Sequence, residues 1–400
     1  MTESLKACWN GVRGAVPRWN LKREIGRTAV ASAIKVDFIV GERDRRPDAM
    51  ERAYRALKSR VEEHVDAREI HYRLPGGIEQ KMLVKYPARA SVYALKAKVK
   101  KRKGSIAHLH NQKLGYLLHV VDLSPCVAFC HDAIEYVLPE YRSPVIYRTF
   151  VKPYHTGTAK ADLIVTPSRH TADEMKRLFR VPEERLRVIP NGVDHSVFRP
   201  VDSGAFRAKH GIPTDRPYVL NVGSEQPRKD VPTAVRAFLR ARKEVPGLMF
   251  VKIGRADELP GHPQREVSLK LLKDAGAEHA TKFIDWVPET LLPGAYSGAA
   301  ALLFPTKYEG FGFPVVEAMA CGTPVVTTNS SSIPEVAGEA AVMRPLGDDV
   351  GMAEAVVRLI RDEDDRQQRI ALGISQSSRF DWDRSAASLL ECYRSLVEKR

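Results

Sequence analysis

The sequence predicts an α/β protein built from two doubly wound domains. A chain of 400 residues is too long for one ordinary hydrophobic core, so two domains of about 200 residues are expected. In both halves, short apolar runs alternate with helical patterns, which is typical of parallel α/β construction. The 44% hydrophobic and 28% charged residues describe a globular chain rather than a disordered or fibrous one.

The second half has the clearer pattern, and it predicts a sheet covered by helices. The expected strands are YVLNVG (218–223), MFVKIG (249–254), TKFIDWV (281–287), ALLFP (301–305) and TPVVTT (323–328). Helical patterns cover 232–244, 265–276, 288–299, 314–321 and 352–362. We expect Asp230 to cap the first of these helices, because an aspartate at this position accepts hydrogen bonds from free backbone N–H groups.

The first half repeats the alternation less clearly. Strands are expected at 36–42, 105–110, 126–132 and 161–168, and an amphipathic helix at 48–65. Residues 187–200 contain turn signals and two prolines, which predicts the linker between the domains. A closing amphipathic helix is expected at 382–399, and residues 1–33 form an N-terminal extension without readable chemistry.

Cysteine usage and hydropathy indicate a cytoplasmic protein. The five cysteines are scattered and form no CxxC pair, which favours free thiols over a disulfide framework or a zinc site. Cys126 and Cys130 lie in an apolar run and are expected to be buried filler. No apolar stretch approaches the ~18 residues needed to span a bilayer, and the N-terminus lacks the apolar core of a secretory signal.

The net charge of +14 is concentrated in the first half of the chain. Residues 1–200 hold 37 Lys and Arg against 22 Asp and Glu, and the densest run is 95–104. Such a field attracts a lipid headgroup layer, a polyprenyl phosphate or nucleic acid. A solvated helix face is the alternative for any single cluster. Nucleic acid is disfavoured because the run has no interleaved aromatic residues.

The segment EGFGFPVVEAMACGTPVV (309–326) is the most informative part of the chain. The preceding strand delivers Glu309 to its carboxyl end, where open α/β sheets bind ligands. Gly310 and Gly312 allow a tight turn that brings backbone N–H groups close to a ligand. Pro314 suits the first helical position and would put Glu317 in the first turn of the helix.

Glu317 lies in a helix that is otherwise apolar, and a buried carboxylate is costly unless it accepts strong hydrogen bonds. Vicinal ribose hydroxyls would supply two donors, and the helix N-terminus favours an anionic diphosphate. An ordinary surface cap would explain Glu317 alone, but not the Gly-Phe-Gly-Phe-Pro turn before it. The segment therefore predicts a site for a nucleoside diphosphate.

This segment resembles the paired-glutamate motif of retaining glycosyltransferases with the GT-B fold, specifically glycosyltransferase family 4. The two glutamates stand eight positions apart, as in that family. NVGSEQPRKDVPTAVRAF (221–238) resembles the family's strand, loop and helix with an Arg-Lys pair, and 188–200 resembles its interdomain linker. The resemblance covers about 125–397 and implies two Rossmann-like doubly wound domains facing across a cleft.

The resemblance also implies a domain organisation. Residues 34–197 would form an acceptor-side domain, and residues 198–380 would bind the nucleotide sugar. The helix within 381–400 resembles the family's helix that crosses back to pack on the N-terminal domain.

Roles at the donor site follow from the same resemblance. Arg228 and Lys229 would grip the donor diphosphate and neutralise the charge on the leaving group. Glu317 would bind the ribose, and Glu309 the hydroxyls of the donor sugar. Further donor contacts are expected from Gly223, Val287, Gly310, Phe311, Gly312 and Phe313.

CVAFCHDAIEY (126–136) places His131 and Asp132 at the end of an expected strand. They resemble the family's His-Asp pair, whose histidine lies against the donor sugar near the reacting carbon. A lone histidine is more often structural, but the strand-end position favours function. Because the family retains the anomeric configuration, we expect front-face attack by the acceptor hydroxyl, with the donor phosphate as base. No DxD-type cluster is placed to hold a metal ion, so none is expected.

The sequence therefore predicts a retaining, metal-independent hexosyltransferase that uses a UDP- or GDP-linked sugar and no separate cofactor. GDP-mannose is slightly favoured, because HDAIEY and EQPRKD resemble mannosyltransferase segments. The acceptor would be a glycan or a polyprenyl- or lipid-linked sugar, reached by peripheral contact with an anionic membrane. A non-catalytic scaffold that binds sugar nucleotides or glycans is the alternative. A dehydrogenase is disfavoured because no strand is followed by GxGxxG.

One segment departs from the family pattern. Many members have a Gly-rich turn after the first strand, whereas VDFIVGERDRRPDAM (36–50) offers only Gly41. Either the first strand lies elsewhere, or the acceptor-side geometry differs from the usual pattern.

Overall fold

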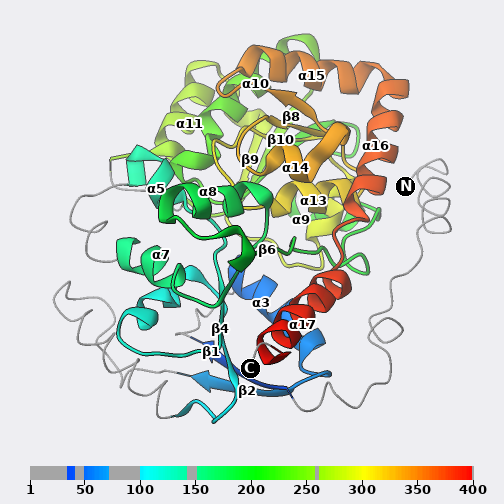
Figure 1. Ribbon diagram of the computed structural model, residues 1–400. Helices are drawn as coiled ribbons and strands as arrows, with labels where there is room; N and C mark the ends of the chain where they lie inside the picture. The colour runs from blue at the N-terminus through cyan, green and yellow to red at the C-terminus, as the bar shows by residue number, and fades with distance from the viewer. Residues whose placement is uncertain (1–33, 41–48, 72–99, 142–150, 257–260, 399–400) are drawn as a thin grey trace. The chain divides into compact units, whose positions relative to one another are not determined.

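The computed structural model describes residues 34–40, 49–71, 100–141, 151–256 and 261–398 (Figure 1). These residues form two compact units. One unit holds residues 34–192 together with 382–398, and the other holds 193–381. Each unit contains one parallel six-stranded sheet with helices packed on it, so the predicted fold class is confirmed.

The sheet of the first unit has the strand order β2-β1-β3-β4-β5-β6. Its strands are β1 (Lys35–Val40), β2 (Asp66–His71), β3 (Ile106–Leu109), β4 (Cys126–Phe129), β5 (Leu163–Thr166) and β6 (Leu186–Val188). The strand expected at 36–42 is therefore present as β1, in contact with both β2 and β3. This position overturns the alternative that the first strand lies elsewhere. The turn that contains Gly41 is outside the described residues.

Helices of the first unit include a segment from the far end of the sequence. They are α3 (Ala49–Val61), α5 (Ile134–Val137), α7 (Lys152–Thr158), α8 (Arg169–Phe179) and α17 (Trp382–Glu398), with the 3-10 helix η2 (Gln112–His119). The helix α17, red in Figure 1, packs on α3. Arg60 of α3 pairs with Asp383 at 2.5 Å, and Tyr393 of α17 shares a 2.6 Å hydrogen bond with His108 of β3.

The sheet of the second unit has the strand order β12-β11-β10-β7-β8-β9. Its strands are β7 (Tyr218–Val222), β8 (Met249–Ile253), β9 (Thr281–Ile284), β10 (Ala301–Phe304), β11 (Val325–Thr328) and β12 (Val342–Arg344). In chain order this arrangement is 3-2-1-4-5-6, the Rossmann order, and the order reverses between β7 and β10.

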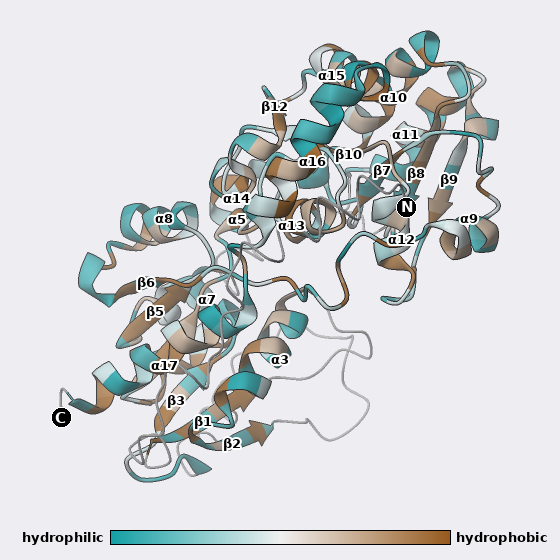
Figure 2. Cartoon of the chain, turned by 90° about the vertical axis from the view of Figure 1, so that its right-hand side faces the viewer, coloured by the Kyte–Doolittle hydropathy of each residue, from teal (hydrophilic) through white to brown (hydrophobic). Residues whose placement is uncertain are grey.

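Apolar side chains of this sheet pack on both of its faces, as the continuous hydrophobic strands of a parallel sheet require. Tyr218 and Leu220 belong to one buried cluster and Val219 to the other, because successive side chains of a strand point to opposite faces. The helices are α9 (Gly204–His210), α10 (Val231–Glu244), α11 (Gln264–Asp274), α12 (Leu292–Ser297), α13 (Phe313–Ala320), α14 (Ile333–Ala337), α15 (Asp349–Arg361) and α16 (Glu363–Ser377). In Figure 2 the strand β8 is coloured as hydrophobic and the helix α16 as largely hydrophilic.

One local prediction was wrong. Asp230 stands at the N-cap position of α10, but it has a φ of 46° and its carboxylate caps no backbone N–H. The carboxylate instead accepts a 2.8 Å hydrogen bond from the hydroxyl of Thr233. The segment 187–200, expected as the linker, contains the boundary between the two units at residues 192 and 193, and its first two residues belong to β6.

The densest basic run is partly structural where it is described, from residue 100 onward. Arg102 donates from its backbone N–H to Asp37 Oδ2 at 2.8 Å, and its Nε lies 2.9 Å from Asp37 Oδ1. It also pairs with Asp66 at 2.7 Å. Although burial alone raises the pKa of Asp37, hydrogen bonds from Arg102, Ser105 and Arg68 hold that pKa below its ordinary value. Arg102 is therefore a clamp between β1 and β2 rather than a free surface charge.

Within the residues that the structure describes, no helix is both long and apolar enough to traverse a lipid bilayer. Cys126, Cys130, Cys321 and Cys392 are free and buried, which agrees with the prediction of free thiols for these four.

Candidate functional site

The residues expected to bind a diphosphate lie at the point where the strand order of the second sheet reverses. β7 and β10 are neighbours in this sheet, with Ala301 beside Val219. The loop after β7 carries Arg228 and Lys229 in the short 3-10 helix η6 (Pro227–Lys229), and the loop after β10 carries Glu309. Ligands of open α/β sheets bind at such a reversal, at the carboxyl ends of the strands.

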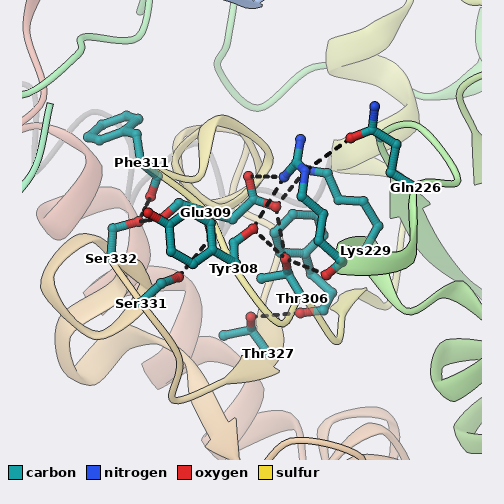
Figure 3. Close-up of polar contacts among 12 residues, drawn as sticks. Gln226, Lys229, Thr306, Tyr308, Glu309, Phe311, Thr327, Ser331 and Ser332 are labelled. Carbon is teal, nitrogen blue, oxygen red and sulfur yellow. Dashed lines mark hydrogen bonds and ion pairs between the residues drawn. The ribbon is translucent and has the colours of Figure 1, made fainter. Parts of the chain in front are cut away.

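The carboxylate of Glu309 joins the two loops. Lys229 Nζ lies 2.6 Å from Glu309 Oε1, and Arg228 Nη1 lies 2.9 Å from Glu309 Oε2. Thr306 donates a further hydrogen bond of 2.8 Å to Oε1. Figure 3 shows Lys229 and Thr306 directed toward this carboxylate. The two residues expected to grip the diphosphate and the one expected to hold the donor sugar thus form one cluster of charges.

Two serines fix the backbone of the loop after β10. The N–H of Glu309 donates to Ser331 Oγ at 2.8 Å. The hydroxyl oxygen of Ser332 lies within hydrogen-bond distance of the carbonyl oxygens of Glu309, at 2.9 Å, and of Phe311, at 2.8 Å. The loop is therefore held from the segment that precedes α14, as Figure 3 shows for Ser331 and Ser332.

Burial changes the proton affinities of this cluster. The side chain of Lys229 is 8% exposed and that of Glu309 is 9% exposed. Burial and the nearby charge of Arg228 lower the pKa of Lys229 to about 8, against the opposing effect of Glu309. Burial alone would raise the pKa of Glu309, but the charges of Arg228 and Lys229 hold it below its ordinary value. The cluster of Arg228, Lys229 and Glu309 therefore carries a net positive charge only while Lys229 keeps its proton.

The turn after Glu309 needs glycine at one position. Gly312 has a φ of 113°, and a Cβ there would lie 2.9 Å from the Cδ1 of Ile333. Gly312 is the N-cap residue of α13, which begins at Phe313 rather than Pro314. The predicted place of Glu317 in the first helical turn is therefore wrong: Glu317 is the fifth residue of the helix, one position beyond that turn.

Glu317 is buried, as its apolar surroundings predict, with 4% of its surface exposed. Tyr296 of α12 donates a 2.7 Å hydrogen bond to Glu317 Oε2. The protein thus supplies a strong hydrogen bond to this carboxylate, as a buried charge requires. The contact of Tyr296 with Glu317 was not predicted from the sequence. Tyr296 lies in an apolar helical segment, where a tyrosine is typical of the hydrophobic core.

The other expected donor contacts lie in the same unit. Gly223 follows β7 with a φ of 139°, and a Cβ on it would lie 3.4 Å from Lys229 Cε. Phe311 and Phe313 meet edge to face at 5.3 Å, and Val287 is a buried residue of the loop after β9. Gly310 separates Glu309 from this aromatic pair.

His131 and Asp132 belong to the other unit and follow β4. His131 is buried, its Nε2 lies 2.9 Å from the carbonyl oxygen of His110, and its backbone N–H donates to Gln112 at 3.1 Å. The carbonyl oxygen of Asp132 accepts a 3.0 Å hydrogen bond from His155. These contacts fix the turn after β4, and His155 is a positioning residue that sequence reasoning missed.

Comparison with known proteins places both units in one group of enzymes. The family described as Glycosyl transferases group 1 matches residues 202–375, and that described as Glycosyltransferase Family 4 matches residues 23–197. An O-antigen chain mannosyltransferase B of Escherichia coli is 28% identical over 287 residues, which are 70% of this chain and 72% of that protein. A D-inositol 3-phosphate glycosyltransferase of Acidothermus cellulolyticus is 30% identical over 249 residues. This alignment spans 60% of the chain but only 55% of that relative.

Solved structures show the same fold. A sucrose-phosphate synthase of Thermosynechococcus elongatus superposes with a TM-score of 0.75 at 21% identity, over 92% of this chain and all of that one. HepE of Anabaena, solved in complex with UDP and glucose, gives a TM-score of 0.72 at 17% identity, over 90% of this chain and all of that one.

Proposed function

Because the chain belongs to glycosyltransferase family 4, we propose that it is a retaining transferase that moves a hexose from a UDP- or GDP-linked sugar to a glycan or lipid-linked acceptor. The observation that carries this proposal is the contact of Glu309 with Arg228 and Lys229 at the strand reversal of the second unit. Two cations beside a tight turn suit a diphosphate, because this anion binds to positive charges and accepts hydrogen bonds from backbone N–H groups.

Each residue of the cluster then has a distinct task. Arg228 and Lys229 bind the diphosphate and neutralise the charge that develops on the nucleoside diphosphate as it leaves. Glu309 holds hydroxyls of the donor sugar, and Glu317 holds the ribose. Gly223, Val287 and the 310–313 turn, with Gly310, Phe311, Gly312 and Phe313, complete the donor contacts.

In the transfer step, the acceptor oxygen attacks the anomeric carbon on the face from which the diphosphate departs. The bond between that carbon and the diphosphate oxygen breaks, and the acceptor proton passes to the departing phosphate. His131 and Asp132 would contact the sugar near this carbon. The protein supplies orientation and charge, and no covalent intermediate or metal ion takes part.

A panel of UDP- and GDP-linked sugars with detection of released nucleotide tests the proposal. The similarity to an O-antigen chain mannosyltransferase favours mannose as the transferred sugar, so GDP-mannose is the first donor to try and UDP-glucose the second. Glu317→Ala should abolish donor binding, while Glu339→Ala, at an exposed position of the same unit, should not. Activity should survive EDTA. Binding without turnover against glycan and lipid-linked acceptors would instead assign a non-catalytic scaffold.

We also propose a cytoplasmic location with peripheral attachment to anionic membrane through the basic first half of the chain. Neutralising Lys96, Lys98, Lys100 and Lys103 should weaken sedimentation with anionic vesicles, and salt should weaken it too. Arg102 stays unchanged in this variant, because it clamps Asp37. Salt-independent partitioning, or none at all, would count against the attachment.

A further inference from the structure

A lysine is completely buried beneath the turn that leads to the Arg-Lys pair. Lys252 lies in β8 with none of its surface exposed. Its Nζ donates to the carbonyl oxygen of Gly223 at 2.6 Å and to that of Ile253 at 3.1 Å. Burying an ammonium group costs free energy unless hydrogen bonds and opposite charges compensate for the lost solvent. The burial of Lys252 therefore calls for an explanation.

Two charged residues accompany this lysine. Glu225 is also fully buried, with its Oε1 3.8 Å from Lys252 Nζ. Arg265 of α11 contacts both oxygens of Glu225, through Nη2 at 2.6 Å and Nε at 2.7 Å. Burial lowers the pKa of Lys252 to about 7, although Glu225 opposes that change. Lys252 and Glu225 together anchor both ends of the segment 223–225.

The carbonyl of Gly223 and the N–H of Ser224 belong to one peptide group, and in a trans peptide these two bonds point in opposite directions. Since Lys252 binds the carbonyl oxygen from the interior of the sheet, the Ser224 N–H points away from that interior. Among the described residues, no acceptor receives a hydrogen bond from this N–H. The N–H is thus available at the carboxyl end of β7.

The same peptide touches the cationic cluster. Lys229 Cε lies 3.4 Å from where a Cβ on Gly223 would be. On the other side, a Cβ on Gly254 would lie only 1.9 Å from the Gly223 carbonyl oxygen. The peptide therefore packs closely between the end of β8 and Lys229.

We propose that Lys252 is a positioning residue of the donor site: it turns the 223–224 peptide so that the Ser224 N–H is presented to the donor diphosphate beside Lys229. Lys252 itself does not touch the donor. Glu225 and Arg265 fix the positions of the Lys252 side chain and of the loop after β7. This inference rests on the proposed function, because it takes the loop after β7 to be the diphosphate site.

The inference is tested by calorimetry on the full chain, which compares the affinity of the wild-type protein and of Lys252→Met for UDP and GDP. Loss of the oriented N–H should weaken binding of the preferred nucleoside diphosphate about tenfold, the usual worth of a hydrogen bond to a charged group. In turnover of the nucleotide sugar, KM for the donor should rise more than kcat falls. Lys270→Met removes an exposed lysine of the same unit and should leave both unchanged.

Other outcomes separate the two proposals. If the wild-type protein binds UDP or GDP and Lys252→Met binds it equally well, the positioning role is wrong and the proposed function stands. A fall in kcat at unchanged donor KM would likewise indicate a purely structural lysine. If the wild-type protein binds no nucleoside diphosphate or nucleotide sugar, the proposed function itself fails. Should Lys252→Met not fold, the Glu225→Gln/Lys252→Met variant removes both members of the ion pair and answers the same question.

Discussion

Glu309 is the counter-charge of a buried lysine and a half-buried arginine. Its carboxylate lies within 2.9 Å of Arg228 and 2.6 Å of Lys229. In the proposed function, a donor diphosphate would compete with Glu309 for these two cations. Glu309 would then be released to bind hydroxyls of the donor sugar.

Replacing Glu309 by glutamine should destabilise the protein by about 3–5 kcal/mol, because it leaves the buried Lys229 and the half-buried Arg228 without their partner. The free energy of unfolding in urea measures this loss. Inorganic diphosphate should recover more stability in Glu309→Gln than in wild type, since it replaces the missing charge. Glu339→Gln, at an exposed position, is the control. A variant as stable as the control would refute the role of Glu309 as counter-charge.

The sequence predicted the residues of this cluster but not their contacts. Arg228 and Glu309 are far apart along the chain, and only the pairing of β7 with β10 brings them together. Motif spacing carries no information about such pairing. The position of Glu317 within its helix was misjudged by one residue, because a proline suits more than one position of a first helical turn.

At the scale of elements, the ends of β7 and β8 are joined by two glycines whose backbones touch. Gly254 has a φ of 128°, and its N–H donates to the carbonyl oxygen of Ile284 at 2.8 Å. The N–H of Gly223 donates to the carbonyl oxygen of Ile253 at 2.9 Å. No side chain fits between these strand ends.

Gly254→Ala should therefore cost about 3 kcal/mol or more, because the methyl group meets a backbone oxygen and the φ is strained. Gly276→Ala is the matched control, since its φ is 59° and no atom lies within 4 Å of the added Cβ. That change should cost about 1 kcal/mol, from backbone strain alone. Chemical denaturation compares the two. Equal losses would show that the contact between the two glycines is unimportant.

The burial of His108 in β3 should make stability depend on pH. Burial lowers the pKa of His108, the partner of Tyr393, to about 3, below the ordinary 6.5. Between pH 6.5 and 3 the unfolded chain therefore binds a proton that the folded chain does not, and stability falls as the pH falls. The contribution is at most about 1.4 kcal/mol per pH unit.

Unfolding of wild type and of His108→Phe/Tyr393→Phe across this pH range measures the contribution. The double variant should lose less stability on acidification, whereas Tyr393→Phe alone keeps the buried histidine and should retain most of the slope. Parallel pH profiles for wild type and the double variant would exclude His108 as the source.

At the scale of the whole molecule, the alternation of apolar runs and helical patterns was sufficient to predict two parallel sheets. The strands β2, β6 and β12 were not predicted. β6 and β12 have only three residues each, and β2 is a mostly polar, partly exposed strand, so none of them contains a continuous apolar run. Their positions depend on the neighbouring strand rather than on their own composition. The strand order of each sheet is also a tertiary property that periodicity cannot supply.

Removal of residues 382–400 should destabilise the unit of residues 34–192 and spare the other one. Buried side chains of α17, including Leu389, Leu390 and Tyr393, complete the core of that unit. In thermal unfolding of the truncated chain, the transition of the first unit should shift to a lower temperature. UDP or GDP should still raise the midpoint temperature of the transition of the second unit. A uniform loss in both transitions would contradict this division of stability.

The discontinuous make-up of the first unit also has a consequence for synthesis on the ribosome. Residues 193–381 can fold as soon as they have emerged, because every strand and helix of their unit is then present. Residues 34–192 emerge earlier but lack α17 until nearly the whole chain has been translated. The half that is made first is therefore completed last, and until then the surface that α17 will cover is open to chaperones.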